Sequence, residues 1–270
     1  MIKKAVIPVA GLGTRLAPAT SAIPKTMFPL LDKPVLHYVI DEARKSGISE
    51  IALVVGSNRS VIEQYLAAQQ EAFSDLSLSL IVQEKLNGLG AAILCAQDFI
   101  GQDSFAVLLG DSITLSSTPV IGQLVSVHLK TAGAVIGVEE VDVSRVDRYG
   151  IAGGEKQSGD LMKITELVEK PSIEFAPSNW AIAGRYILPS DTLEALAKVP
   201  PGINNEIQLT DAIAALLPDI DCYACRYSGD RFDIGNAVDY LQACIKIGLQ
   251  RPDTAQAVRQ LLSRCEKSAD

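Results

Sequence analysis

The stretch 9-VAGLGTRLAPATSAIPK-25 follows a short apolar run, 5-AVIPV-9, and decides how the rest of the chain is interpreted. Paired glycines after a predicted strand let backbone amides approach phosphate groups closely. A dinucleotide-binding loop must open directly into a helix, but three prolines follow Gly13 by position 29 and exclude one. A Walker A loop is excluded as well, because no Gly-Lys-Ser/Thr follows. The stretch therefore predicts a long, stiff phosphate-binding loop of another kind.

Two cationic side chains strengthen this prediction. Arg15 supplies a planar fork of donors and Lys25 a mobile point charge, and both suit phosphate oxygens. The alternative is an ordinary surface turn with solvated basic residues. A strand, two glycines, an arginine and a lysine in this order favour the phosphate-binding interpretation.

The composition narrows the function classes. The chain has 270 residues, of which 32 are acidic and 24 basic, so its surface should repel nucleic acid unless a local basic patch exists. It has no transmembrane-length apolar stretch and no signal-peptide pattern, which predicts a soluble, cytoplasmic protein without a membrane partner. Five scattered cysteines do not form a disulfide framework. Cys222 and Cys225 form a lone CxxC whose flanking alternation favours a strand over a metal or redox site.

Strand-like apolar runs alternate with amphipathic helical ones over the first 145 residues. The predicted strands are 5–10, 50–56, 78–83, 105–111 and 134–141, and the predicted helices are 35–47, 60–70, 90–99 and 120–130. This alternation favours an α/β fold with a mainly parallel sheet covered by helices. Short strands follow from about residue 146, with helices near 191–199 and 206–217, and two final helices break at Pro252.

From residue 3 to about residue 250 the chain resembles the nucleotidyltransferases that activate sugar 1-phosphates. The segments that carry this resemblance are 11-GLGTRLAPATSAIPKTMFP-29, 83-QEKLNGLG-90, 110-GD-111, 149-YG-150, 168-VEKP-171, 184-GRY-186, 205-NEIQLTDAI-213 and 232-FDIGN-236. The resemblance implies a single domain with a Rossmann-like three-layer fold and a mainly parallel mixed sheet. It also implies a nucleotide-binding half (1–145), a sugar-binding half with added strands (146–235), and C-terminal helices (236–270) that form a homodimer or homotetramer.

The resemblance also implies a reaction. Within the family, the motifs are most similar to those of enzymes that convert UTP and glucose 1-phosphate into UDP-glucose and pyrophosphate with Mg²⁺. The implied roles place the nucleotide on Ala10, Gly11, Gly13, Thr14, Gln83 and Gly88, the triphosphate charge on Arg15 and Lys25, the metal on Asp111 and Asp233, the sugar on Gly150 and Glu169, and the sugar phosphate on Lys170.

General chemistry agrees with these residue types. Displacement at a phosphate needs charge neutralisation and positioning more than acid–base groups. Magnesium sites use one or two carboxylates together with substrate phosphates. Both histidines, His37 and His128, lie in predicted helices, so we interpret them as structural.

Three positions depart from the family pattern. Thr26 and Phe28 replace the usual residues after the loop lysine, and Ala91 replaces a histidine. The connection between residues 70 and 78 is also short. An enzyme that uses dTTP or CTP, or a non-catalytic regulatory relative, therefore stays open as an alternative. An NAD-dependent dehydrogenase is disfavoured by the prolines that follow Gly13.

Overall fold

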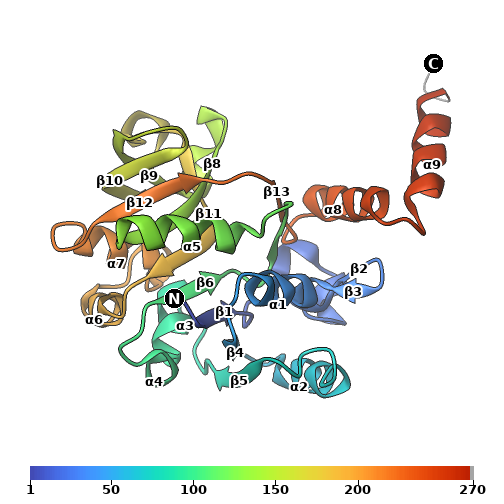
Figure 1. The fold of residues 1–270 in the computed structure, drawn as a ribbon, viewed down its shortest axis with the longest axis horizontal. Coiled ribbons are helices and arrows are strands. Elements are labelled where there is room, and N and C mark those ends of the chain that lie inside the picture. The colour runs from blue at the N-terminus through green and yellow to red at the C-terminus, as the bar shows by residue number, and fades with distance from the viewer. Residues whose placement is uncertain (268–270) are drawn as a thin grey trace.

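The computed structural model describes residues 1–267, and its strands and helices follow the predicted alternation (Figure 1). Four parallel strands lie in the order β5 (Ser77–Val82), β4 (Glu50–Val55), β1 (Lys4–Pro8) and β6 (Phe105–Leu108). All their pairings are parallel, with Ala5 aligned to Ile51 on one side and to Ala106 on the other. This part of the sheet confirms the prediction of parallel strands.

Helices cover both faces of these strands because the strands are apolar on both sides. Ile7 of β1 belongs to one buried core with α1 (Val35–Lys45) and α5 (Val120–Thr131). Val6 belongs to the opposite core, with α3 (Leu89–Cys95), α6 (Asp191–Lys198) and α7 (Leu209–Leu216). The remaining short helices are α2 (Arg59–Ala68) and α4 (Gln97–Ile100).

The sheet continues into a small closed barrel that the sequence did not predict. β11 (Trp180–Leu188) pairs antiparallel with β6 and β8 (Ala134–Glu140), and β8 pairs parallel with β12 (Cys222–Arg226). β12 pairs with β10 (Leu161–Glu169), β10 with β9 (Gly150–Lys156), and β9 returns to β11.

The prediction of a mainly parallel sheet is therefore wrong for this second part. Each pairing of β9, β10 and β11 in the sheet is antiparallel, and only β8 with β12 is parallel. A short turn joins β9 to β10, and such a turn can connect only antiparallel neighbours. Register shifts in β10 and β11 mark bulges, which bend strands enough to close a ring.

Two small sheets complete the fold. β7 (Ser112–Leu115) pairs antiparallel with β13 (Asp230–Asp233), and β2 (Pro29–Leu30) pairs with β3 (Lys33–Pro34). The pairing of β7 with β13 was not predicted. It aligns Asp233 with Ser112, so it brings position 233 beside position 111.

The CxxC motif lies in a strand and both histidines lie in helices, as predicted. Cys222 and Cys225 are free thiols in β12, where burial raises their pKa to about 12 and about 11, so both stay protonated at neutral pH. His37 Nδ1 lies 2.6 Å from the Tyr65 hydroxyl, and His128 Nδ1 lies 2.8 Å from the Gly133 carbonyl.

The chain ends in an arm of two helices that leaves the body (Figure 1). Asn236 begins the arm, because its side chain accepts a 2.9 Å hydrogen bond from the Asp239 amide and so caps α8 (Ala237–Gln250). α9 (Ala255–Lys267) follows the predicted break at Pro252. The last three residues of the predicted segment 236–270 lie outside the described part of the chain. Over residues 1–267, no helix combines the length and the apolar character needed to cross a membrane.

Candidate active site

The opening loop has the extended, non-α-helical course that its prolines predict. Residues 14–27 form three short 3₁₀ turns between β1 and β2. Gly13 begins the first turn in the left-handed region, at φ 68°. A Cβ on Gly13 would lie 3.1 Å from the Lys25 side chain, and one on Gly11 would lie 3.4 Å from Lys25 Nζ. The two glycines therefore let Lys25 pack across the loop backbone.

Predicted nucleotide-site residues follow the carboxyl ends of three parallel strands. Ala10 lies beyond β1, Gln83 beyond β5 and Asp111 beyond β6. The chains after β1 and β6 approach so closely that a Cβ on Gly110 would lie 2.5 Å from Val9 Cγ1. Ligands in open α/β sheets bind at this edge. The fold thus gathers residues that are distant in sequence at the expected place.

Each predicted metal carboxylate lies beside one of the two predicted phosphate cations. Lys25 Nζ forms a short ion pair with Asp111 Oδ2, and Arg15 Nη2 lies 3.3 Å from Asp233 Oδ2. The Ile234 amide donates a 2.9 Å hydrogen bond to the Asp111 carbonyl, which joins the two segments. The sequence prediction that these four residues share one site agrees with this geometry.

The charge state of Asp111 depends on Lys25. Burial alone would raise the pKa of the Asp111 carboxyl, because a charged form is poorly solvated there. The positive charge and hydrogen bond of Lys25, together with smaller effects of a backbone hydrogen bond and of Arg15, outweigh burial, and the pKa is lowered below its ordinary value. Asp111 is therefore a carboxylate at neutral pH and can accept a cation.

The donor set at Asp111 and Asp233 fits Mg²⁺ only in part. Carboxylate oxygens are suitable ligands for this hard cation, and substrate phosphates commonly complete its coordination. Within residues 1–267, His, Cys, Asp and Glu side chains nowhere gather in threes as a ready-made metal site. The two aspartates would therefore hold the ion together with phosphate oxygens.

Gln83 and Gly88 lie together in a buried corner that the 206–207 segment closes. The Gln83 side chain is buried and donates to the Gly88 carbonyl at 3.3 Å. The Gly90 amide donates to the Ile207 carbonyl at 2.9 Å, which pairs the two backbones. Gly88 has φ 109°, a conformation that glycine adopts without strain.

We expect Gly88→Ala to weaken nucleotide binding without removing any polar group. Its Cβ would lie 2.8 Å from both the Ile207 carbonyl oxygen and Glu206 Cβ, and φ 109° is strained for alanine. The Michaelis constant for the nucleotide should rise ~10-fold, because a displacement of the backbone that costs ~1.4 kcal/mol of binding free energy weakens binding by that factor. Gly101→Ala is the matched control, since its φ is 61° but its Cβ would meet no atom within 4 Å. An equal rise in both variants would contradict the steric explanation.

The predicted sugar residues form a second group at the end of β10. Gly150 aligns with Glu169 across the strand pair, and a Cβ on Gly150 would lie 3.0 Å from Glu169 Oε2. Lys170 Nζ lies 3.6 Å from Glu169 Oε1. Lys170 has φ 47°, an unusual value for a non-glycine residue and one often found at functional sites.

Thr210 links the two groups and was missed by the sequence analysis. Its hydroxyl donates a 2.6 Å hydrogen bond to Glu169 Oε2 from the first turn of α7. The same segment reaches the Gly88 corner through Ile207. The motif 205-NEIQLTDAI-213 was the available signal, but it identified no contact partner.

The three departures from the family pattern lie in the interior. Thr26 is 1% exposed, Phe28 6% and Ala91 7%. The Phe28 ring packs edge-on against Tyr240 of α8, with ring centroids 5.8 Å apart. These substitutions therefore change packing around the loop, while both cations and both carboxylates are retained.

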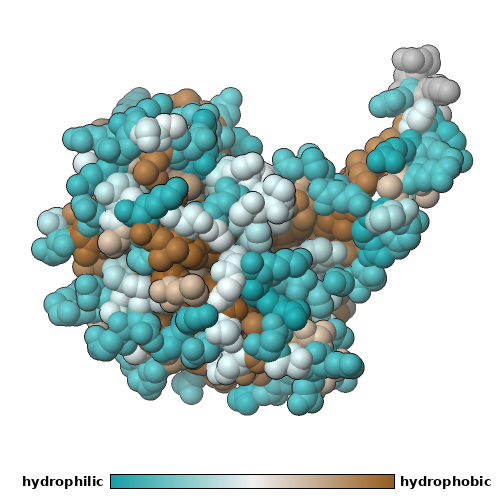
Figure 2. Space-filling view, viewed as in Figure 1, coloured by the Kyte–Doolittle hydropathy of each residue, from teal (hydrophilic) through white to brown (hydrophobic). Residues whose placement is uncertain are grey.

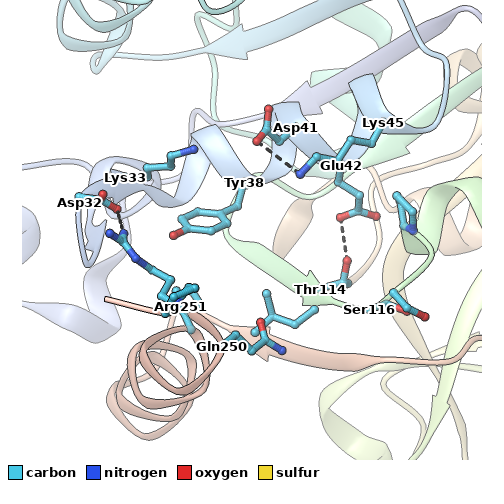
Figure 3. A pocket seen from close by; sticks show the side chains of 15 residues that line it. Asp32, Lys33, Tyr38, Asp41, Glu42, Lys45, Thr114, Ser116, Gln250 and Arg251 are labelled. Atoms are coloured by element: carbon cyan, nitrogen blue, oxygen red, sulfur yellow. Dashed lines mark hydrogen bonds and ion pairs between the residues drawn. The ribbon is translucent and has the colours of Figure 1, made fainter. Parts of the chain in front are cut away.

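A cavity of about 800 Å³ lies apart from these groups, between α1, β7 and α8 (Figure 3). Asp41 and Lys45 approach each other on one side of it, and Asp32 pairs with Arg251 on the other. Glu42 also lines it and accepts a 2.8 Å hydrogen bond from Thr114. No residue predicted for the active site lines this cavity.

Known proteins are similar to this chain in both sequence and fold. A family model described as nucleotidyl transferase matches residues 4–248. The UTP–glucose-1-phosphate uridylyltransferase of Staphylococcus haemolyticus is 43% identical over 93% of this chain and 94% of that protein. A UDP-glucose pyrophosphorylase complexed with UDP-glucose is 36% identical, with a TM-score of 0.88 over 93% of this chain and all of that one. A UTP-bound UGPase from Acinetobacter baumannii is also 36% identical, with a TM-score of 0.86 over 97% and 99% of the two chains. The chain therefore belongs to the nucleotidyl transferase family, and within it to the group of UTP–glucose-1-phosphate uridylyltransferases.

Proposed function

We propose that the chain catalyses UTP + α-D-glucose 1-phosphate → UDP-glucose + pyrophosphate, a reversible transfer with direct displacement at the α-phosphate. The names of its relatives and the UTP and UDP-glucose bound by similar structures support the substrates. The single observation that carries the proposal is the cluster of Arg15, Lys25, Asp111 and Asp233 beyond the parallel strands.

Each residue of this cluster has a proposed task. Arg15 and Lys25 bind the β- and γ-phosphates and stabilise the departing pyrophosphate. Asp111 and Asp233 would hold Mg²⁺, which when bound would neutralise phosphate charge. Lys170 holds the phosphate of glucose 1-phosphate, whose oxygen attacks the α-phosphorus in line with the leaving group.

The existing ion pairs support a coupled binding step. Each cation now neutralises one carboxylate. A bound triphosphate would give Arg15 and Lys25 phosphate partners and would leave Asp111 and Asp233 available to hold the metal ion. Metal and nucleotide should therefore bind more tightly together than separately.

Nucleotide selectivity rests on Gln83 and Gly88, together with backbone contacts at Ala10, Gly11, Gly13 and Thr14. Gln83 would read the pyrimidine edge of the base, with its amide already oriented by the Gly88 carbonyl. Gly150 and Glu169 would contact the sugar, and Thr210 orients the Glu169 carboxylate. The same base edge occurs in dTTP and CTP, which is why those nucleotides are the main alternatives.

Pyrophosphate release tests the proposed reaction. Purified protein with Mg²⁺ and glucose 1-phosphate should release pyrophosphate with UTP far faster than with dTTP, CTP, ATP or GTP. Equal rates with dTTP would instead indicate an enzyme for several pyrimidine nucleotides. Absence of turnover by folded protein that still binds UDP-glucose would support the regulatory alternative.

The C-terminal arm supports a proposed homo-oligomer, a dimer or a tetramer. Apolar side chains on the arm are widely exposed, with Val238 at 64%, Leu241 at 60% and Leu261 at 52%. Figure 2 shows apolar surface along α8, where the arm leaves the body. Sedimentation of the full chain, compared with a Leu241→Glu variant, measures whether this surface holds subunits together.

We also propose that the domain has a three-layer nucleotide-binding half and a separate sugar-binding half. Helices on both faces of β5, β4, β1 and β6 support a Rossmann-like three-layer arrangement for the nucleotide-binding half, 1–145. The position of Lys170 and Glu169 supports residues 146–235 as the sugar-binding half of one domain.

A further inference from the structure

We propose that Arg185, held by Glu42, is a positioning residue that fixes the turn carrying Asp111. This role rests on the proposed function, in which Asp111 holds the metal ion. Arg185 belongs to the motif 184-GRY-186, whose role the sequence did not reveal. It lies on β11, at a distance of 74 positions along the chain from Asp111.

Arg185 and Glu42 form an ion pair inside the protein. The Arg185 side chain has no exposed surface and the Glu42 side chain is 6% exposed. Arg185 Nη2 lies 2.8 Å from Glu42 Oε2, and Arg185 Nε lies 3.1 Å from Glu42 Oε1. A buried pair is weak evidence for a gain in stability, because two hydrophobic side chains often replace one without loss. Its presence is better explained by the groups that it holds in place.

The guanidinium of Arg185 forms hydrogen bonds to the backbone on both sides of Asp111. Arg185 Nη2 donates to the Ser112 carbonyl at 2.8 Å, and Nη1 donates to the Leu109 carbonyl at 3.3 Å. These two carbonyls flank the dipeptide Gly110–Asp111. The Ser112 amide closes the turn by donating to the Leu109 carbonyl at 3.3 Å. One rigid planar group thus sets the direction in which the Asp111 side chain leaves the backbone.

The backbone of β11 explains why Arg185 lies in this position. The strand pairing with β8 shifts register between Ile182 and Tyr186, which marks a bulge. Gly184 within it has φ 79°, and a Cβ there would lie 2.8 Å from Leu109 Cδ1. Bulges near active sites commonly redirect a side chain. Here the bulge brings β11 against the turn and buries Arg185 beneath it.

Glu42 accepts hydrogen bonds from two further groups, so the loss of one of them should leave its pair with Arg185 in place. Thr114 and the Ile121 amide donate to its carboxylate at 2.8 Å and 3.1 Å. Figure 3 shows Glu42 and Thr114 facing each other between α1 and β7. Helix α1, β7, β11 and α5 therefore converge on one charged pair below Asp111.

The test separates positioning from mere stability. Arg185→Lys keeps the charge and can pair with Glu42, but one ammonium cannot span both flanking carbonyls. We expect half-saturating Mg²⁺ to rise at least ~10-fold and kcat to fall, with little change in the Michaelis constant for glucose 1-phosphate. Binding of Mn²⁺ in the presence of UTP, followed by electron paramagnetic resonance, should weaken by the same factor. This second readout does not depend on turnover.

Two further variants make the result decisive. Thr114→Val removes a partner of Glu42 but leaves both carbonyl contacts of Arg185, so its metal dependence should match that of the wild type. Glu42→Gln should act in the same direction as Arg185→Lys, and it decides the outcome if Arg185→Lys does not fold.

Three outcomes would contradict the proposal. Variants that melt earlier yet bind Mn²⁺ and turn over normally would overturn the positioning role. An equal loss in Thr114→Val would overturn it as well. A wild-type chain fully active without any divalent ion would instead contradict the metal assignment, and the positioning role would fall with it.

Discussion

The substitution Asp111→Asn should lower the rate of pyrophosphate release by at least ~10³-fold, equivalent to ~4 kcal/mol of transition-state stabilisation. The substitution keeps the size of the side chain but removes the charge that would bind the metal. The Asp111 carbonyl still accepts from the Ile234 amide, so the local backbone has no reason to change. The rate should be measured at saturating substrates, with circular dichroism and thermal melting as tests of folding.

Asp98→Asn is the matched control, because Asp98 is an exposed carboxylate in the first turn of α4. It should retain the wild-type rate. Retention of most activity by Asp111→Asn would show that this carboxylate does not hold the metal. A similar loss in Asp233→Asn would support a shared role for the pair.

Methionine at position 25 should lower turnover by ~10²–10³-fold, because it removes a cation from the leaving pyrophosphate. The substitution should also reverse the direction in which the pKa of the Asp111 carboxyl is shifted. Burial is the largest single influence on the Asp111 carboxyl and Lys25 is the main group that opposes it, so without Lys25 we expect the pKa of this carboxyl to rise above its ordinary value. Lys130→Met, which changes an exposed lysine of α5, is the control for loss of a positive charge.

The expected change in the pKa shift of Asp111, from lowered to raised, also changes how the stability of the protein depends on pH. In the wild type the lowered pKa of Asp111 contributes stability above the ordinary carboxyl value, and this contribution disappears as the pH falls through the lowered pKa. In Lys25→Met the raised pKa makes folding favour the protonated form, so stability improves as the pH falls through it. The melting temperature of the variant should therefore lie furthest below that of the wild type near pH 7, and the difference should shrink towards pH 4. A difference that stays constant with pH would contradict the coupling of Lys25 to Asp111.

Local patterns predicted most of the longer strands and helices and the course of the opening loop. Apolar runs and their periods were enough for β1, β4, β5 and α1, and prolines were enough for the opening loop. These features depend on near neighbours in sequence, where steric rules are strong.

Long-range pairings could not be predicted in the same way. β7 and β13 have four residues each and are more than a hundred positions apart, so neither has a pattern that specifies its partner. The insertion of β11 between β6 and β8 depends on a bulge around Gly184. The Arg185–Glu42 pair was not predicted for a related reason. The sequence of an apolar strand does not identify the residue that pairs with a buried charged side chain in it.

β11 is common to both halves of the protein. It is hydrogen-bonded along one edge to β6, which precedes Asp111, and to β9, and along the other edge to β8. A strand anchored along both edges is a poor hinge, because bending it would break pairings on two sides at once. The separation between the Asp111 and Lys170 regions is thus set when the chain folds. Adjustment to substrates then falls to the largely exposed opening loop, so we expect substrate binding to move this loop while the Asp111 and Lys170 regions keep their separation.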